Sequence, residues 1–432
     1  MQDKVLIITY YWPPSGGSGV QRWLKFVKYL PSLGIEPHVY TPLNPDFNVK
    51  DDSFLRDIPN EAVVIKKKII EPYGFYRLLV GKKNAEGANS GMANKKEGTK
   101  QKLAMWVRSN FFIPDPRVFW VKPSIRFLKK YIEENNIEKI ITSGPPHSMH
   151  LIGLRLKKHF GSKIEWATDF RDPWTRVYNK DDFKLSKRSR NKINKLENEV
   201  ISNCDKLITV SNFLRSEFIE MGADENKVYA VTNGYDEDDF VSNEIIQKDK
   251  FIIAYYGFLP EVSNPKILWE VLGELINENK KIKENLELRF IGRVDSSILE
   301  DIKTNKLENN TSVSGYVKHS ELKEYYKDAQ VLLLTIANVE NSKGILTGKI
   351  FEYLASKRPI LAFGDTEGEV NKILNETNSG VLCGYNKKEK VRNSLLSLFE
   401  DYENKKLHIS TSQIDMYSRR NLTKKIVELI FK

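Results

Sequence analysis

The pattern of hydrophobic positions changes its period many times along this chain. Short apolar runs alternate with longer segments in which apolar residues recur every three or four positions. This alternation is typical of buried parallel strands separated by amphipathic helices. It predicts doubly wound α/β domains, with helices on both faces of each sheet. The predicted strands are residues 4–9, 37–41, 139–142, 164–167, 206–210 and 228–231, and then 251–256, 286–291, 312–314, 331–335, 360–363 and 380–383.

Length and a polar break indicate how the chain is divided. A chain of 432 residues is too long for one core and suits two domains of roughly 200 residues each. A polar stretch without a core pattern predicts a linker at residues 241–250, between a domain over 1–240 and a domain over 251–414. The predicted helices include 20–30, 124–134, 147–158 and 211–221 in the first half and 266–278, 321–328, 349–356, 369–375 and 388–402 in the second.

Composition indicates packed domains rather than a disordered or membrane-spanning chain. Hydrophobic residues make up 40% and aromatic residues 11% of the sequence, which is ample for cores. No run reaches the ~18 apolar residues that a membrane span needs. Strand 4–9 leaves no room for a signal peptide before it, and the two distant cysteines, Cys204 and Cys383, imply no disulfide framework. We therefore expect a cytoplasmic location.

The net charge of +11 is unevenly distributed. Residues 64–130 contain 16 Lys or Arg and 4 Asp or Glu, a net of +12, so the rest of the chain sums to −1. Aromatic residues such as Phe75, Trp106 and Phe111 are interleaved with this charge, which predicts contact with an anionic membrane surface. A solvated basic excursion with a few core anchors is the alternative, and we find no nucleic-acid-binding motif. Residues 81–100 indicate a mobile surface loop.

A glycine-flanked loop leads into the predicted helix 349–356. Loops of this shape direct backbone N–H groups and a helix N-terminus at an anion, usually a phosphate. Glu352 cannot itself face a phosphate, but it can accept hydrogen bonds from sugar hydroxyls. Together these features predict a nucleotide site, and an ordinary connection with an exposed Glu is the alternative. The predicted donor-binding residues in this segment are Gly344, Ile345, Leu346, Thr347, Lys349 and Glu352.

Two further segments accompany this loop. Strand 4–9 leads into Pro-Pro-Ser-Gly-Gly-Ser-Gly at 13–19, and Val-Thr-Asn-Gly-Tyr-Asp at 231–236 has Phe240 behind it. With residues 344–363, and in this order, they resemble the retaining nucleotide-sugar glycosyltransferases of family 4. The resemblance implies the GT-B fold, in which two Rossmann-like domains face each other across a cleft. It also implies a final helix, within 415–432, that crosses back to pack on the N-terminal domain.

The glycine-rich loop after the first strand lies where α/β proteins bind ligands, at the carboxyl end of the sheet. We predict that Gly16 and Gly17 approach the donor pyrophosphate and that Ser18 contacts the acceptor. A nicotinamide dinucleotide site is the rival interpretation, and it needs an acid at the end of the second strand. That strand ends at Pro42, with no acid before Asp46, so a dehydrogenase is disfavoured.

His147 follows a strand and lies in the first turn of a predicted helix. A helix N-terminus disfavours the charged imidazole, so a neutral ring that hydrogen-bonds a hydroxyl is expected. In the resembling family, a residue near this position contacts the transferred sugar or the acceptor. We predict a catalytic role for His147, and a histidine that caps or packs against a loop is the alternative.

Asp169 and Asp172 flank Arg171 directly after a strand. Two carboxylates around an arginine indicate a mutually neutralising network. We predict that Asp169 is catalytic and that Asp172 binds the acceptor, with Trp174 as an apolar platform for a sugar face. A purely structural ion pair is the alternative. The chain has no Asp-x-Asp triplet, which disfavours a metal-dependent transferase of the GT-A type.

The resemblance also implies a lysine and an arginine on the donor diphosphate. Lys266 matches the lysine and is a predicted catalytic residue, whereas Phe258 stands where arginine is common. Arg293 is the candidate to supply the missing charge, and Val317 is predicted to meet the nucleotide base through backbone groups. The first of the family's paired glutamates falls at Gly344, so this loop must stabilise the diphosphate mainly through backbone N–H groups.

The function that the resemblance implies is that of a retaining hexosyltransferase of bacterial polysaccharide synthesis. It would transfer sugar from a nucleotide diphosphate to a hydroxyl of a lipid-linked glycan, with no cofactor and no metal. Front-face attack is expected because no carboxylate pair fits double displacement, and the leaving phosphate would take the acceptor proton. A nucleotide-sugar 2-epimerase and a non-catalytic sugar- or lipid-binding scaffold are the alternatives. The expected location is the inner face of the cell membrane, peripherally bound.

Overall fold

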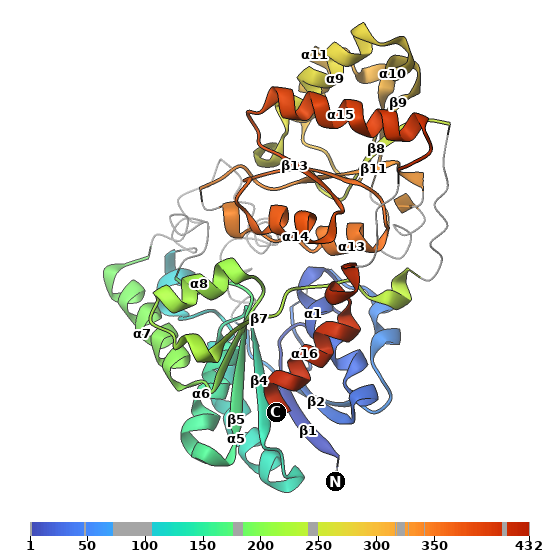
Figure 1. Ribbon diagram of the computed structural model, residues 1–432. Helices are drawn as coiled ribbons and strands as arrows, with labels where there is room; N and C mark the ends of the chain where they lie inside the picture. Colours follow the sequence, from blue (N-terminus) through green and yellow to red (C-terminus); the bar gives the residue numbers. More distant parts are fainter. Residues whose placement is uncertain are drawn as a thin grey trace. The chain divides into compact units, whose positions relative to one another are not determined.

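The computed structural model describes residues 2–46, 49–71, 106–175, 185–240, 249–315, 317, 325–326, 328–340, 342–407 and 413–431. The chain forms two compact units, coloured from blue to red along the sequence in Figure 1. Unit 1 comprises Met1–Thr232 with Leu422–Lys432, and unit 2 comprises Asn233–Asn421. Phe75 and the predicted loop 81–100 lie outside the described residues, as do most of the predicted linker 241–250 and helix 321–328.

Unit 1 is built on a parallel sheet of seven strands in the order β3-β2-β1-β4-β5-β6-β7. The order reverses between β1 and β4, as in doubly wound folds. The strands are β1 (Asp3–Ile8), β2 (Ile35–Pro42), β3 (Val63–Lys67), β4 (Lys139–Gly144), β5 (Glu165–Phe170), β6 (Lys206–Thr209) and β7 (Val228–Ala230).

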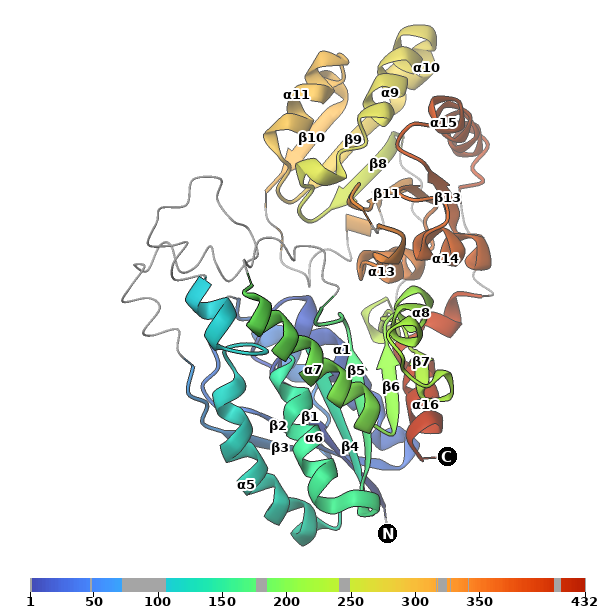
Figure 2. The ribbon, with the colours of Figure 1, turned by 90° about the vertical axis from the view of Figure 1, so that its left-hand side faces the viewer.

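Helices cover both faces of this sheet. Because successive side chains of a strand point to opposite faces, Val5 and Ile7 join the core under α1 and α16, while Leu6 and Ile8 join the core under α5 and α6. Figure 2 shows α5, α6 and α7 side by side on that second face. The helices of unit 1 are α1 (Ser18–Tyr29), α5 (Val118–Asn135), α6 (Ser148–Phe160), α7 (Lys187–Asn203), α8 (Asn212–Glu220) and α16 (Arg419–Phe431).

Unit 2 repeats this plan with six parallel strands in the order β10-β9-β8-β11-β12-β13. All six residues of β8 are buried, and they alternate between the cores on the two faces of the sheet. The strands are β8 (Phe251–Tyr256), β9 (Leu286–Ile291), β10 (Thr311–Ser314), β11 (Val331–Thr335), β12 (Ile360–Phe363) and β13 (Gly380–Cys383). The helices are α9 (Lys266–Glu278), α10 (Lys280–Asn285), α11 (Ser296–Thr304), α13 (Lys349–Ala355), α14 (Glu369–Thr377) and α15 (Lys388–Glu403).

The C-terminal helix α16 packs on the sheet of unit 1. Its apolar residues Leu422, Ile426 and Ile430 share a core with β1 and α1. The unit boundary falls after Thr232, whereas the prediction placed it after residue 240. The segment between belongs with unit 2 because Tyr235 exchanges backbone hydrogen bonds with the residues at the beginning of α16: its N–H donates to the carbonyl of Tyr417, before the helix, and its carbonyl accepts from Arg419, the first residue of the helix.

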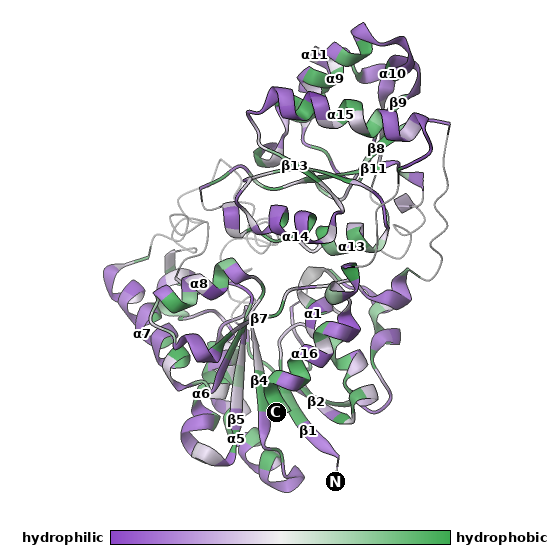
Figure 3. Ribbon diagram, viewed as in Figure 1, coloured by the Kyte–Doolittle hydropathy of each residue, from purple (hydrophilic) through white to green (hydrophobic). Residues whose placement is uncertain are grey.

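Several elements were not predicted, among them β3, α7, α10 and α11. β3 ends in lysines at the start of the basic window, and only a few of the residues of α7 are apolar. Figure 3 accordingly colours much of α7 purple and much of β1 green. The helix predicted to begin at Ser124 begins at Val118 and continues through Pro123. Within the described part of the chain, no helix is both long enough and apolar enough to cross a membrane.

Candidate functional site

Each sheet has a topological switch point, and the predicted site residues gather near these two places. In doubly wound sheets, ligands bind at the carboxyl ends of the strands where the strand order reverses. In unit 1 the loops after β1 and β4 meet this description, and they carry Gly16, Gly17 and His147. In unit 2 the loops after β8 and β11 do so, and they carry Phe258 and the segment Gly344–Lys349.

The glycine-rich loop of unit 1 leads directly into α1. Gly17, the residue before the helix, has a φ of 85°, which favours glycine. The Gly16 N–H donates to the Val49 carbonyl at 2.8 Å, and a Cβ on Gly16 would lie 2.9 Å from the Val49 side chain. The loop is therefore braced by a neighbouring segment. The predicted contacts of Gly16, Gly17 and Ser18 with donor and acceptor stay predictions.

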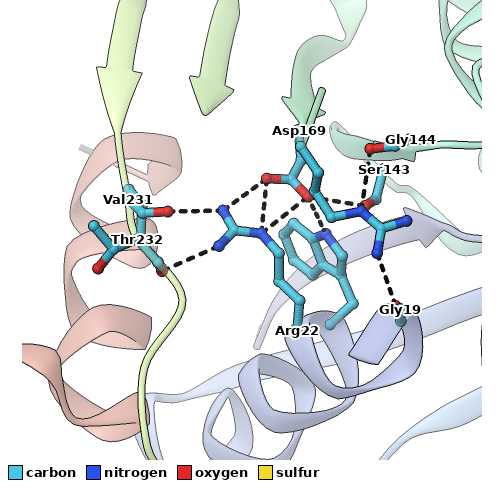
Figure 4. A network of polar contacts seen from close by, with 9 residues as sticks. Gly19, Arg22, Ser143, Gly144, Asp169, Val231 and Thr232 are labelled. Atoms are coloured by element: carbon cyan, nitrogen blue, oxygen red, sulfur yellow. Dashed lines mark hydrogen bonds and ion pairs between the residues drawn. The ribbon is translucent and has the colours of Figure 1, made fainter. Parts of the chain in front are cut away.

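Asp169, at the end of β5, is fully buried and pairs with an arginine that the sequence analysis did not single out. Both carboxylate oxygens accept from Arg22 of α1, at 2.7–3.2 Å. The Trp23 indole N–H and the Ser143 hydroxyl donate to Oδ2 at 2.7 and 2.8 Å. Figure 4 shows these groups converging on the carboxylate. Burial acts to raise the pKa of Asp169, but Arg22 outweighs it and holds that pKa below its ordinary value.

The guanidinium of Arg22 also reaches the two residues that directly follow β7, the last strand of unit 1. Its guanidinium donates to the Val231 carbonyl at 2.9 Å and to the Thr232 carbonyl at 3.0 Å. Thr232 is the last residue of unit 1 before the chain enters unit 2. Arg22 therefore ties α1, the end of β5 and the exit of the chain into one buried network. The predicted role of Asp169 toward an acceptor receives no support from this geometry, because its oxygens already have protein donors.

The Arg171 charge acts to lower the pKa of both flanking aspartates, but its hydrogen bonds go to backbone carbonyls. Its Nε donates to the Gly144 carbonyl at 3.1 Å, one terminal nitrogen donates to the Gly19 carbonyl at 3.0 Å, and the other donates to the Pro145 carbonyl. The reason is geometric: Asp169 lies within β5, where Arg22 reaches it, whereas Arg171 is the residue after the strand and reaches the Gly19 and Gly144 carbonyls. Arg171 thus braces the loops after β1 and β4 against each other.

His147 precedes α6 and is held neutral, chiefly by burial. Desolvation lowers the pKa of His147 well below its ordinary value, with smaller contributions from His150 and Arg171. The N-terminus of α6 is occupied by Asp115, which accepts from the Ser148 N–H and hydroxyl at 2.8 and 2.9 Å. The Nδ1 atom of His147 is shielded from solvent and has no hydrogen-bond partner in the described structure. A neutral imidazole was predicted here, and its role toward a substrate stays a prediction.

Trp174 and Asp172 lie in different surroundings. Trp174 is only 8% exposed, and its ring stacks 5.1 Å from His147 within the core of unit 1. Its backbone N–H donates to the buried Glu197 carboxylate at 2.6 Å. This burial argues against the predicted open platform for a sugar face, because the ring lies among the rings of His147, His150 of α6 and Phe170 of β5. Asp172 is exposed to solvent, although desolvation by the surrounding protein raises the pKa of its carboxyl, and its predicted contact with an acceptor stays a prediction.

In unit 2 the loops after β8 and β9 are joined through two glycines. Gly257 and Gly292 have φ values of 96° and 127°, and a Cβ on Gly292 would lie 2.4 Å from the Gly257 carbonyl oxygen. This close approach carries Phe258 and Arg293 to the same place, where the Arg293 guanidinium lies 4.8 Å from the Phe258 ring centroid. The sequence analysis related Arg293 to Phe258 only as the candidate to supply the charge that Phe258 lacks. In the structure the two side chains are in contact.

Lys349, the first residue of α13, reaches the same end of the sheet. Its ammonium donates to the Tyr255 hydroxyl at 2.6 Å and lies 4.2 Å from the centroid of that ring. A Cβ on Gly257 would come within 3.4 Å of the ammonium nitrogen. The Lys349 charge is thus fixed beside the loop after β8 by an aromatic partner, and it forms no ion pair with a carboxylate among the described residues.

Glu352 lies three residues further along α13, on the same side of the helix. Its Oε2 accepts from the Tyr326 hydroxyl at 2.9 Å. Burial first, and the Glu352 charge second, raise the pKa of Tyr326 well above its ordinary value, so this hydroxyl stays a donor. In the loop before α13, the Thr347 hydroxyl oxygen is shielded from solvent and has no partner among the described residues.

The other predicted residues of unit 2 are less closely grouped. Lys266 begins α9 with a side chain that is 70% exposed, and its ammonium lies 3.8 Å from an Asp301 oxygen. Gly344 is buried, and Ile345, Leu346 and Val317 pack against the core of unit 2. The ligand roles of all these residues stay predictions.

Sequence reasoning missed Arg22, Tyr255 and Tyr326. Arg22 lies among Val20, Trp23 and Leu24, and a charged residue in such an apolar helix is a signal of a buried partner. Asp169 after a buried strand was the corresponding signal for the carboxylate. Tyr255 and Tyr326 carried no such signal, because each contact depends on a lysine or glutamate far along the chain.

Comparisons with known proteins agree with this architecture. The model of Glycosyltransferase Family 4 matches residues 93–239, and the model of Glycosyl transferases group 1 matches residues 236–413. No curated protein matches the chain in sequence. Among solved structures, a glycosyltransferase from Rickettsia africae is 14% identical with a TM-score of 0.61, over 99% of this chain and 97% of that one.

Two other solved structures share the fold. The HepE protein of Anabaena in complex with UDP is 12% identical with a TM-score of 0.60, over 99% of this chain and 98% of that one. Sucrose-phosphate synthase from Thermosynechococcus elongatus is 11% identical with a TM-score of 0.58, over 99% and 98%. These likenesses and the two doubly wound sheets identify the fold as GT-B. The two family models adjoin and together run from residue 93 to residue 413, so the chain belongs to the glycosyltransferases of the family 4 type.

Proposed function

We propose that this glycosyltransferase moves a hexose from a nucleotide diphosphate sugar to a hydroxyl acceptor, with retention of anomeric configuration. One observation carries the proposal: Lys349 and Glu352 lie on one side of α13 at the switch point of unit 2, each held by a neutral tyrosine hydroxyl. An ammonium suits a diphosphate, and a carboxylate suits the hydroxyls of a ribose. The Thr347 hydroxyl, which has no hydrogen-bond partner in the described part of the chain, offers a further polar contact between Gly344 and Lys349.

The donor class has support from a structural neighbour. The HepE structures, which share the fold, contain UDP, and one of them contains UDP-glucose. In this chain the Arg293 guanidinium stacked on Phe258 and the Lys349 ammonium both lie at the carboxyl end of the sheet of unit 2. We assign these two cations, with Lys266, to the charge of the leaving diphosphate, in place of a metal ion or other cofactor.

The proposed reaction is a front-face displacement. The acceptor oxygen bonds to the anomeric carbon on the side from which the diphosphate departs, and the bond from that carbon to the diphosphate oxygen breaks. The acceptor proton passes to the departing phosphate oxygen, so atoms and charge balance. Well-placed donors to such a leaving group are each worth about 3 kcal/mol of barrier. The saturation of Asp169 by protein donors supports this route, because that carboxylate has no oxygen left to act as a nucleophile.

We further propose that the acceptor is a lipid-linked glycan in cell-surface polysaccharide synthesis and that the enzyme works peripherally at the inner face of the cell membrane. The support is the net charge of +11 and its concentration in unit 1. An enzyme that extends a membrane-bound glycan must reach the bilayer surface, and basic residues near an anionic leaflet provide that attraction.

Replacing Glu352 tests the donor site. A hydrogen bond to a charged group is worth about 1.5–3 kcal/mol, so Glu352→Ala should weaken the binding of UDP-glucose or another accepted donor by at least tenfold. Calorimetric titration of a panel of nucleotide sugars measures this loss. The matched control is Glu270→Ala, which removes an exposed glutamate from α9 of the same unit. Unchanged affinity of Glu352→Ala for every nucleotide sugar that the wild type binds would refute the proposed donor site.

Product analysis tests the reaction. Incubation with donor and a hydroxyl acceptor should yield a glycoside whose anomeric configuration, read by proton NMR, equals that of the donor. Inversion would contradict the front-face route. Incubation with donor alone separates the epimerase alternative, because an epimerised nucleotide sugar would form without any acceptor. Binding of donor with no product under either condition would favour a non-catalytic scaffold.

A further inference from the structure

Unit 1 exposes large aromatic side chains in one place. Trp106 is 41%, Phe111 is 68% and Phe119 is 51% exposed. Residues 106–111 form a helical turn before α5, and Phe119 is the second residue of α5. The rings of Trp106 and Phe111 lie 6.0 Å apart, and Phe112 lies 5.7 Å from Phe119. Exposed aromatics that cluster in this way are unusual on a monomer and mark an interaction site.

The turn that carries this cluster is fastened to the beginning of α7. The Asn110 side chain accepts from the Ser186 N–H at 2.7 Å, and the Asn110 carbonyl accepts from the Ser189 hydroxyl. The aromatic cluster therefore lies at the N-terminal ends of both α5 and α7. α6 packs against both helices, and Figure 2 shows the three helices together as one layer of unit 1.

The outer surface of this layer is strongly basic. α5, α6 and α7 together contain twelve Lys or Arg and four Glu, a net of +8 within a chain of net +11. On α5 the exposed Phe119, Lys122 and Arg126 follow one another at helical spacing. On α7 the exposed Arg188, Lys192 and Lys195 do the same on the side opposite its buried residues.

The charge of α7 is largely uncompensated. Within the part of the chain that the structure describes, Lys187, Arg188, Arg190 and Lys192 form no ion pair with a carboxylate. The two acids of α7 are placed elsewhere: Glu197 is buried under Trp174 and Thr175, and Glu199 pairs with Lys158 of α6. The aromatic cluster thus adjoins a row of cations, most of which form no ion pair with a carboxylate among the described residues.

We propose that the aromatic cluster and the basic outer faces of α5 and α7 form the surface by which unit 1 binds an anionic phospholipid leaflet. Aromatic rings suit the boundary between headgroups and acyl chains, and lysines and arginines beside them suit anionic headgroups. The inference rests on the proposed function, which requires a membrane-borne acceptor. It adds which surface of unit 1 contacts the membrane. This surface includes Trp106 and Phe111 of the basic window predicted from the sequence, and it adds α7, which lies outside that window.

The arrangement favours lipid over nucleic acid. A single strand is bound by a groove in which aromatic rings are spaced to stack successive bases. Here the rings contact one another edge to face at one end of a layer of helices, while the cations extend along the helices from that end. A compact group of aromatic rings with lysines and arginines beside it is typical of a surface that binds an anionic bilayer.

Sedimentation with vesicles tests the basic part of the surface. We expect the wild type to bind phosphatidylcholine vesicles that contain phosphatidylglycerol and to be released by high salt. A basic residue near an anionic leaflet contributes roughly fivefold to partitioning, so the triple variant Arg188→Gln, Lys192→Gln, Lys195→Gln should partition about a hundredfold less. The matched control, Lys280→Gln, Lys283→Gln, Lys303→Gln, removes three exposed lysines from unit 2 and should bind like the wild type.

Tryptophan fluorescence tests the aromatic part. The other six tryptophans are buried, each at most 8% exposed, so a quencher in the bilayer reports on Trp106. Brominated phosphatidylcholine in anionic vesicles should quench the wild type, and Trp106→Phe should abolish that quenching while leaving sedimentation nearly intact. Vesicle binding without any quenching of Trp106 would overturn the insertion of the cluster.

Other outcomes separate this inference from the proposed function. Equal vesicle binding by the α7 triple variant and its unit 2 control would overturn the surface, as would binding to a duplex or single-stranded DNA probe but not to anionic vesicles. With a water-soluble acceptor, the α7 triple variant should transfer sugar at the wild-type rate. If the α7 triple variant loses vesicle binding but keeps the wild-type transfer rate, the result supports the proposed surface. If the wild type binds vesicles but transfers no sugar, the result counts against the proposed function and not against the surface.

Discussion

The carboxyl ends of the two sheets hold their charges in opposite ways. In unit 1, Asp169 and Arg22 are buried against each other, and the carboxylate accepts from three side chains. In unit 2, the Lys349 ammonium and the Arg293 guanidinium lie against the rings of Tyr255 and Phe258, and neither forms an ion pair with a described carboxylate. Aromatic partners orient a cation without neutralising it.

This difference in partners distinguishes a charged residue that stabilises the fold, such as Asp169, from one that is available to a ligand, such as Lys349. A buried carboxylate with every oxygen occupied would have to break protein contacts to bind a substrate, and each broken contact costs free energy. A cation held by a neutral ring keeps its charge for an incoming anion. The number and kind of protein partners, more than position at the end of a strand, therefore decides which charged residue belongs to a binding site.

The strongest test of this difference is Asp169→Asn. Removing one partner of a buried ion pair leaves the Arg22 charge uncompensated, which costs about 3–5 kcal/mol. We expect the free energy of unfolding of unit 1 to fall by that amount. Chemical denaturation followed by tryptophan fluorescence measures it, because six of the seven tryptophans belong to unit 1.

The exposed Asp172 provides the control, since Asp172→Asn should change the stability by no more than about 0.5 kcal/mol. If Asp169→Asn left stability unchanged and abolished sugar transfer instead, Asp169 would belong to the catalytic machinery, and the distinction drawn between the two units would fail.

Much of the fold was predictable from the sequence. The strands β8, β9, β11, β12 and β13 and the helix α9 have the predicted bounds, because buried parallel strands appear as short, nearly continuous apolar runs. α7 and β3 were missed because their many polar residues interrupt the regular spacing of apolar positions that indicates a helix or a strand. The pattern on α1 predicted an apolar face correctly, but it could not reveal that Arg22 and Lys25 on the other side are also buried, by ion pairs with Asp169 and Asp57.

The candidate site was predictable in position more than in detail. Glycine-rich loops and polar residues after strands indicate the carboxyl end of a sheet, and the two switch points lie there. The partners were not predictable, since Arg22 and Asp169 are separated by most of unit 1, and Lys349 and Tyr255 by about half of unit 2. Local sequence also suggested that Arg171 neutralises its neighbours, whereas the fold directs it to backbone carbonyls.

A second test concerns pH and His150 of α6. This fully buried ring, whose Nδ1 atom shares a hydrogen bond with the Thr142 hydroxyl at 2.9 Å, has its pKa lowered by burial from 6.5 to about 3. The unfolded state therefore binds the proton more readily, and stability falls as pH drops below 6.5. Between pH 6.5 and pH 5 the loss from one such group is about 2 kcal/mol.

Denaturation curves of the wild type and His150→Gln at several pH values check this. The variant should lose about 2 kcal/mol less than the wild type over that interval, whereas His159→Gln, which changes an exposed histidine at the end of the same helix, should follow the wild type. A slope unaltered by His150→Gln would show that other groups govern the acid sensitivity of unit 1.

The smallest expected effect is in unit 2, at the contact between Phe258 and Arg293. A partly exposed cation–π pair is worth about 0.5–1 kcal/mol. If the ring orients the guanidinium toward the donor diphosphate, Phe258→Leu should weaken UDP binding by roughly two- to fivefold without changing stability by more than about 0.5 kcal/mol.

A double-mutant cycle with Arg293→Ala separates this effect from a direct contact of the Phe258 ring with the nucleotide. In the Arg293→Ala background, Phe258→Leu should then have no further effect on calorimetric UDP affinity. Additive losses would mean that Phe258 acts independently of Arg293, and that a cation oriented by an aromatic ring is not what prepares this end of the sheet for an anion.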